Sequence, residues 1–357
     1  MDGSTFGGAV MAHLTGVAGH VSVARQGKVN KICERGWVVD ISLVFLLAAF
    51  GGGLFGAAIG GLPAFIFTGF MVMVGVANAM AGGEFDFTGN IAFGPVFGPH
   101  ISFAGGAAAA AFAAKRGVLE DGKDIATPLI GTRDPLVLVM GGLFGMGGYL
   151  VNAVLVYFLS FAGASGPIPL TDTVALTVVL SALVARVAFG STGLLGTLRD
   201  EDRTRGRLTP GDGHAWVEHQ QTMPQSILLG LGAGLLSGYV VTTFTEAGDQ
   251  FLGPATVLMF GVAAASLILL QIGMPGVVTH HMFLPAAVAT GAAISLGATG
   301  VVAVLAGVAG GILGALFGEL YSRLFLIHGD THIDPPAFAI FTVATIVVII
   351  QIIGGGV

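Results

Sequence analysis

The sequence predicts an all-α, polytopic integral membrane protein, and three observations carry this prediction. Hydrophobic residues make up 54% of the 357 residues and charged residues only 10%, whereas a soluble domain carries about 25% charged residues. The chain contains 59 glycines, which is typical of helices whose backbones pack closely within lipid. Finally, about ten apolar stretches follow one another along the chain.

The ten stretches come close to the ~20 residues that a helix needs to cross the hydrocarbon core. They are residues 38–60, 63–81, 90–114, 135–162, 170–189, 227–244, 254–270, 275–296, 301–326 and 336–353. Four of them start at or beside a proline, namely Pro63, Pro135, Pro254 and Pro336. Proline fits the first turn of a helix because no helical partner for its missing N–H is needed there.

The third and the eighth stretch are interrupted. Two Gly-Pro steps, at 94–95 and 98–99, precede His100, and Pro275-Gly276 precedes the pair His280-His281. Proline removes a helical hydrogen bond and glycine loosens the backbone. We therefore expect a broken or re-entrant segment at each place.

The two interruptions belong to two similar halves. A shift of 180 residues pairs His100 with His280 and Phe103 with Phe283, and residues 141–148 resemble residues 307–314 in composition. The order of segments also agrees, which predicts an internal duplication. The expected organisation is an amphipathic or juxtamembrane segment 1–37, a first membrane repeat 38–190, a polar cytoplasmic linker 191–226 and a second membrane repeat 227–357.

The relative orientation of the repeats stays open at this stage. Basic residues cluster before the first stretch, within 115–133 and within 199–207, and such clusters favour the cytoplasmic side. If residues 90–114 enter and leave on one face, the repeats are parallel. If they cross fully, the repeats are inverted, an arrangement frequent in transporters.

Imidazoles and broken backbone within hydrocarbon are costly unless they line a cavity or pack inside protein. Two such places at matching positions predict a translocation pathway. We therefore expect a channel or secondary transporter for a small polar solute or ion. The predicted pathway residues are His100, His280, His281, Asn90, Ser102, Thr279, Gly94, Gly98 and Gly276.

Three alternatives remain. The histidines could bond backbone carbonyls and lock the broken helices in place. The chain could be a scaffold subunit of a membrane complex that transports nothing, or an intramembrane metalloenzyme. Catalytic signatures such as Gly-x-Ser-x-Gly, His-Glu-x-x-His and the phosphate-binding loop are absent from the sequence, so we expect no enzyme and no cofactor.

Other polar residues receive local interpretations. His328 and His332, with Asp330 and Asp334 between and beside them, are compatible with a divalent metal site. A solvated loop is the favoured interpretation, and metal binding there stays open. Asp334 is expected to cap the last helix, Glu319 and Arg323 to pair across one helical turn, and Arg186 to extend towards the surface.

In architecture the chain resembles duplicated small-solute channels such as those for ammonium, urea and water, and residues 103–106 are similar to a short stretch of ammonium transporters. This likeness implies no substrate. The expected location is the cytoplasmic (inner) membrane of a prokaryote, with several passes. The lipid bilayer and further copies of the chain in a homo-oligomer are the expected partners. The net charge of −6 suggests no nucleic acid.

Overall fold

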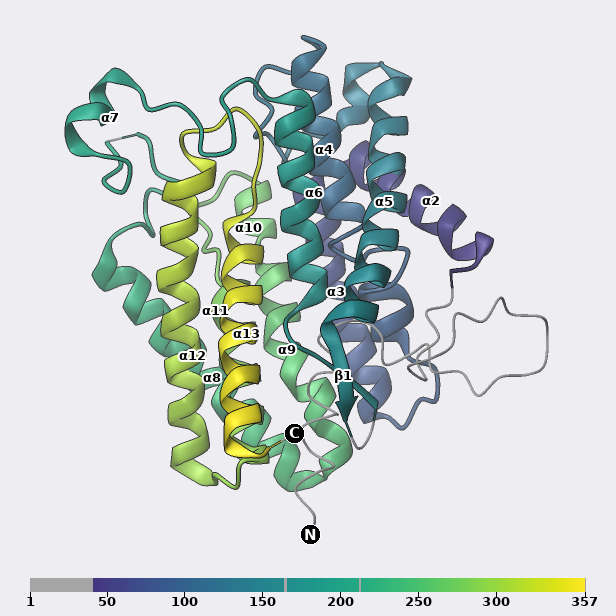
Figure 1. The fold of residues 1–357 in the computed structure, drawn as a ribbon. Coiled ribbons are helices and arrows are strands. Elements are labelled where there is room, and N and C mark those ends of the chain that lie inside the picture. The colour runs from purple at the N-terminus through teal and green to yellow at the C-terminus, as the bar shows by residue number, and fades with distance from the viewer. Residues whose placement is uncertain (1–40, 164–165, 212, 357) are drawn as a thin grey trace.

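The computed structural model describes residues 41–163, 166–211 and 213–356. The segment 1–37, with its predicted amphipathic character, therefore lies outside the described residues. Within the described part, the chain forms twelve α-helices and one short β-hairpin. The long helices lie side by side in a bundle (Figure 1).

The first half contains α2 (Leu43–Ile59), α3 (Gly61–Met80), the π-helical turn η1 (Thr88–Ala92), α4 (Ser102–Lys115), η2 (Leu129–Thr132), α5 (Pro135–Leu159), β1 (Ser160–Gly163), β2 (Gly166–Pro169) and α6 (Thr173–Phe189). The polar linker carries α7 (Asp200–Arg205). The second half contains α8 (Met223–Ala247), η3 (Asp249–Phe251), α9 (Leu252–Ser266), α10 (Ile268–Gln271), α11 (His280–Ser295), α12 (Gly300–Tyr321), η4 (Ser322–Leu326) and α13 (Pro335–Gly354).

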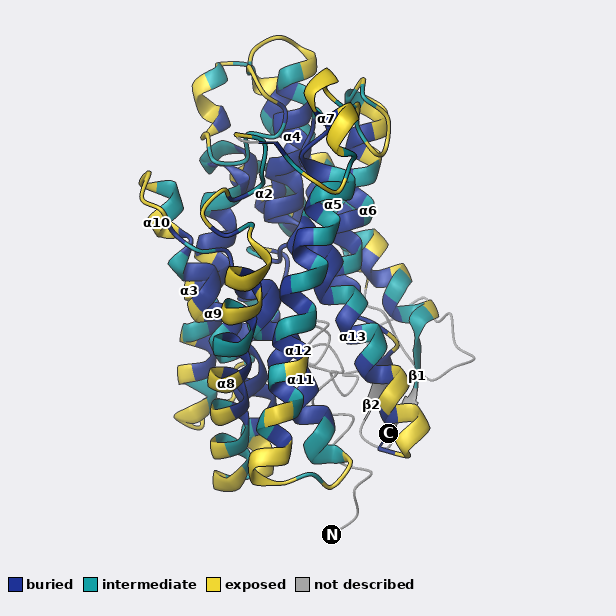
Figure 2. Cartoon of the chain, turned by 90° about the vertical axis from the view of Figure 1, so that its left-hand side faces the viewer, coloured by how far each residue is buried: buried dark blue, intermediate teal, exposed yellow. Residues whose placement is uncertain are grey.

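The expectation of a helical multi-pass membrane protein is confirmed. Among the described residues, six helical segments are long and apolar enough to cross a membrane, and α2 and α6 are shorter apolar helices. Eight of the ten stretches named from the sequence overlap these helices, and the two interrupted stretches, 90–114 and 275–296, overlap α4 and α11. Large apolar side chains such as Leu43, Val187 and Val301 are exposed on the outside of the bundle, as contact with lipid requires (Figure 2).

The helices of the two halves pack in the same pattern. In the first half, α4 contacts α2, α3, α5 and α6, and α2 also packs along α5. In the second half, α11 contacts α8, α9, α12 and α13, and α8 also packs along α12. Between the halves, α3 packs against α9 and α6 against α13. The interrupted helix therefore lies at the centre of each half.

The central helices of the two halves run in opposite directions. Lys115 at the end of α4 donates to Ala188 O at the end of α6, at 2.7 Å. The loop before α13 lies at this same end, because the Ser191 amide donates to Asp330 Oδ2 at 2.6 Å. At the opposite end, Gln351 near the end of α13 donates to Ser295 Oγ at the end of α11. We call the end of the bundle with Lys115 and Ser191 the linker end, and the end with Ser295 and Gln351 the far end.

A glycine on α5 lets this helix pack closely against the start of α4, and a glycine on α12 does the same against the start of α11. A Cβ atom at Gly148 would collide with the carbonyl oxygen of His100, and one at Gly314 would collide with that of His281. The two glycines occupy the same place in the matched stretches 141–148 and 307–314. Each half thus holds the start of its interrupted helix against a glycine face.

Arg186 departs from expectation because it is buried instead of reaching the surface. Its side chain is only 1% exposed. The guanidinium donates to the carbonyl oxygens of Gly193, Leu194, Phe325 and Thr331 at 2.7–3.2 Å. Asp330 Oδ1 lies 3.7 Å away. Arg186 therefore joins α6 and the start of the linker to the loop before α13. It stays buried because the carbonyl oxygens there satisfy its guanidinium N–H groups.

Two local expectations are confirmed. Arg323 lies 3.2 Å from the Glu319 carboxylate, four residues earlier on the same face. The Asp334 side chain accepts from the Ala337 amide at 2.8 Å and caps α13. Asp172 caps α6 in the same way, through the Ala175 amide at 2.8 Å.

Replacing Arg186 with methionine should destabilise the fold by about 3–5 kcal/mol, because the carbonyls and the Asp330 carboxylate would lose their partner. Unfolding of the purified chain in detergent would measure the loss. The matched control is Arg203→Met, since Arg203 is exposed and pairs only with exposed Asp200; its effect should stay within about 0.5 kcal/mol. Equal effects of the two substitutions would contradict the assigned role.

Replacing Gly148 with alanine should cost about 1–3 kcal/mol, the usual result of overpacking a close contact. The neighbouring Gly147 has open space where its Cβ would be placed. Gly147→Ala should therefore be neutral or stabilising by up to about 1 kcal/mol. The same unfolding measurement distinguishes the two, and an unchanged stability of the Gly148→Ala variant would argue against the close approach.

Candidate functional site

A cavity of about 640 Å³ lies between the two halves. Its walls come from α3, α4 and α6 of the first half, from α9, α11 and α13 of the second, and from the linker. At the linker end its lining reaches Lys123 and the exposed Glu218. Towards the far end, apolar side chains including Val72, Val288 and Val343 pack in the same core cluster as the cavity wall. The cavity therefore opens at the linker end and stops at packed core.

Aromatic rings dominate the wall and join the two interrupted segments. The Phe65 ring lies with its centroid 5.7 Å from that of Phe103 on α4 and 4.7 Å from that of His280 on α11. Phe260 lies 5.8 Å from Phe65, and Trp216 of the linker also lines the cavity. The cavity thus forms where the starts of α4 and α11 meet.

Among the histidines predicted for the pathway, His280 lines the cavity. His100 and His281 are buried beside it, 2% and 1% exposed, and are not part of its lining. The ring of His281 packs 5.7 Å from that of Trp216, which does line the cavity. The Nδ1 atoms of all three imidazoles are buried without a hydrogen-bond partner. Bonds from Nδ1 to backbone carbonyls therefore do not fix these rings.

The other predicted pathway residues lie in the interrupted segments, outside the cavity lining. Asn90 in η1 donates to Asp86 O at 2.8 Å, and Ser102 begins α4 and is fully buried. Thr279 is buried at the start of α11, where its side chain makes no capping hydrogen bond.

The three predicted glycines are all buried. Gly94 and Gly98 lie in the irregular stretch between η1 and α4, which leads to Pro99 at the cavity wall. The carbonyl of Gly276 accepts from His219 Nε2 of the linker at 2.6 Å.

Side chains satisfy the backbone where the helices are broken. In the first interruption, Thr68 Oγ1 donates to Phe97 O at 2.6 Å. In the second, the Gln220 amide donates to Val278 O at 2.8 Å and accepts from Val278 N at 2.9 Å. Gln220 belongs to the linker, and sequence reasoning missed it because no local pattern marks a partner 58 residues away.

Besides the exposed Glu218, two carboxylates not included among the predicted pathway residues line the cavity, and both are helix caps. Asp172 precedes α6 and Asp334 precedes α13. His332 lines the cavity too and lies 3.3 Å from Asp334 Oδ1. The available signal was an acidic residue directly before an apolar run in each half.

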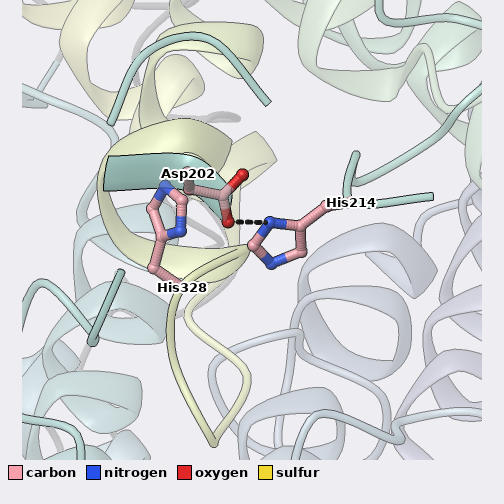
Figure 3. A group of neighbouring side chains, drawn as sticks. All are labelled: Asp202, His214 and His328. Atoms are coloured by element: carbon pink, nitrogen blue, oxygen red, sulfur yellow. Dashed lines mark ion pairs between the residues drawn. The ribbon is translucent and has the colours of Figure 1, made fainter. Parts of the chain in front are cut away.

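A second polar cluster brings together Asp202 of α7, His214 of the linker and His328 of the loop before α13 (Figure 3). One ligand atom from each lies within 4.8 Å of the others. His214 Nδ1 is 2.8 Å from Asp202 Oδ2. The sequence suggested His328 and His332 as two ligands of one metal site. In the structure His328 lies beside Asp202, and His332 lies beside Asp334.

The charges of this cluster follow from its surroundings. Burial lowers the pKa of His328, so its ring is neutral near pH 7. Burial acts to raise the pKa of the Asp202 carboxyl, but the hydrogen bond from Arg199 and the neighbouring His214 outweigh it, and the pKa falls below its usual range. Asp202 is therefore ionised at neutral pH.

Comparison with known proteins places the chain in one family. No curated protein and no solved structure matches it. A family model described as "Family of unknown function (DUF7973)" matches residues 36–355, which is nearly the whole chain, including both halves and the cavity between them. The chain belongs to this family.

Proposed function

We propose that the chain is a secondary transporter for a small organic solute, and that the cavity between its halves is the binding site. The observation that carries this proposal is the meeting of two interrupted helices at one cavity with polar groups in its wall. Transporters often bind substrate where discontinuous helices of two repeats meet. A volume of about 640 Å³ suits a small organic molecule better than a bare ion.

An inverted internal duplication underlies this proposal. The matched packing pattern, the paired glycines Gly148 and Gly314 and the paired caps Asp172 and Asp334 support two related halves. The opposite directions of α4 with α6 and of α11 with α13 favour the inverted arrangement over the parallel one. In this arrangement residues 90–114 cross the bundle.

The linker end is the cytoplasmic face in this proposal. The loop 116–134 and the linker both lie there, and both carry the basic clusters that favour the cytoplasm. Because the cavity opens there and stops at packed core towards the far end, we propose an inward-open carrier. A channel would need a continuous path. A prokaryotic inner membrane and a homo-oligomer stay predictions.

The cavity wall favours an amphipathic organic cation. Phe65, Phe103, Phe260 and Trp216 present aromatic faces, which attract cations. Asp172 and Asp334 supply acceptor oxygens, and His280 supplies an imidazole. The basic residue of the lining, Lys123, lies at the mouth. The proposed substrate class, an organic cation, is narrower than the small polar solute or ion expected from the sequence.

The scaffold alternative is disfavoured by the same geometry. A subunit that transports nothing would have its interrupted segments packed against each other without a space between them, whereas here Pro99, Phe103 and His280 border one cavity.

Ethidium, a fluorescent organic cation, is a suitable probe for this proposal. In proteoliposomes, His280→Ala and Asp172→Asn should each reduce ethidium influx at least about tenfold, a loss of one polar contact worth roughly 1.4 kcal/mol. The matched control is Thr256→Ala, because Thr256 is buried in α9 but bonds its own helix and lies outside the cavity lining. Its flux should equal that of the parent chain.

Binding is measured separately through Trp216. The chain has two tryptophans, so a Trp37→Phe background leaves Trp216 as the reporter in the cavity wall. Ethidium should quench its fluorescence, and His280→Ala should weaken the quenching. Absence of both quenching and flux across organic cations, or full flux in folded His280→Ala and Asp172→Asn chains, would reject the proposal.

A further inference from the structure

The geometry points to a divalent transition-metal site formed by Asp202, His214 and His328, which fastens the linker to the loop before α13. The ligand atoms of the three side chains lie within 4.8 Å of one another, and all three residues come from different parts of the chain (Figure 3). This site is separate from the proposed carrier function and stands without it.

The cluster contains two buried polar atoms that lack a hydrogen-bond partner. Asp202 Oδ1 and His328 Nδ1 are buried and have no hydrogen-bond partner, whereas His214 Nδ1 lies 2.8 Å from Asp202 Oδ2. Buried polar atoms without a partner are uncommon in proteins, because each costs about 1–3 kcal/mol. A cation bound between them would satisfy both atoms at once and could take His214 Nδ1 as its third ligand.

The tautomers of both histidines prepare Nδ1 for a metal. His214 Nε2 lies 2.7 Å from Ile327 O, and His328 Nε2 lies 3.1 Å from Arg207 O. A carbonyl oxygen can only accept, so both Nε2 atoms carry the proton. In the neutral ring of His328, Nδ1 then presents its lone pair. His214 Nδ1 faces Asp202 Oδ2 at 2.8 Å, so a bound cation would take the place of the proton between these two atoms. Metal-binding histidines are commonly oriented in this way, by a hydrogen bond from the other ring nitrogen to a carbonyl.

Two imidazole nitrogens and one carboxylate oxygen suit Zn²⁺ and related ions, including Co²⁺. The ionised Asp202 supplies the negative charge. Arg199 donates to Asp202 Oδ2 at 3.0 Å and opposes a bound cation, but its side chain is 45% exposed and its charge is screened by solvent. Its hydrogen bond holds the carboxylate in orientation and leaves Oδ1 unsatisfied.

The position of the site gives it a structural role. His214 borders the cavity mouth, followed along the chain by Trp216 and Glu218 in the lining. Gln220 of the same linker bonds the second interruption. A metal that joins Asp202 and His214 to His328 therefore holds the linker across the cavity mouth and against the second half.

The test uses the full-length chain, purified in detergent with a tag that contains no histidine. After chelation and dialysis, Zn²⁺ titration should show one ion per chain, and Co²⁺ should give visible absorption bands of a nitrogen- and oxygen-ligated ion. His328→Ala, His214→Ala and Asp202→Asn should each weaken Zn²⁺ binding by at least about 100-fold, since even the loss of a group that orients a ligand costs 10- to 100-fold.

Two variants in the same region are matched controls. Asp200→Asn removes an exposed carboxylate from α7, and His219→Ala removes a linker imidazole that bonds Gly276 O. Both should keep the parent Zn²⁺ affinity and Co²⁺ spectrum. Circular dichroism and gel filtration confirm folding. No Zn²⁺ binding by the parent chain, which would leave a His214–Asp202 ion pair alone, overturns the proposal. Equal binding by parent and folded ligand variants also overturns it.

Discussion

A helix that begins inside an apolar bundle leaves its first backbone groups without helical partners, and each half of this chain contains such a helix. In a membrane no water within the hydrocarbon can satisfy them. Here α4 and α11 start deep in the protein, and Thr68 and Gln220 bond the broken backbone that precedes them. The glycine faces of α5 and α12 allow the chain to pack directly against His100 and His281. The cavity lies at the starts of these two helices.

Composition and apolar periodicity were sufficient to predict the membrane class and the order of helices. Pro135 and Pro335 lie at the first helical positions, and Asp172 and Asp334 cap the helices that follow them. Such features depend on a few neighbouring residues, so the sequence displays them. The hairpin of β1 and β2 was not expected, because its two strands are only four residues each. The direction of the second half relative to the first depends on contacts between distant segments, and local patterns cannot reveal it.

In the candidate site, too, local sequence patterns reveal some features, whereas others depend on contacts between distant segments. The sequence pointed to two interruptions without distinguishing among His100, His280 and His281. Burial separates them: His280 borders the cavity, whereas His100 and His281 lie in the packed protein beside it. The first turn of a helix directs each of its side chains to a different side. Which of them faces a cavity therefore depends on how the helix is rotated about its axis. One residue turns a helix by about 100°, and this is sufficient to separate neighbouring His280 from His281.

Arg186 and the Asp202 cluster show why the polar linker is part of the membrane domain's architecture. Arg186 donates to carbonyls of the linker's first residues, of η4 and of the loop before α13. His328 lies in that same loop and faces Asp202 and His214, and Gln220 follows them to the second interruption. From the linker end, the segment between the halves thus contacts the second half at three successive places. In the proposed carrier the halves must alter their mutual contact to change access, and a linker bonded at these places would constrain that motion.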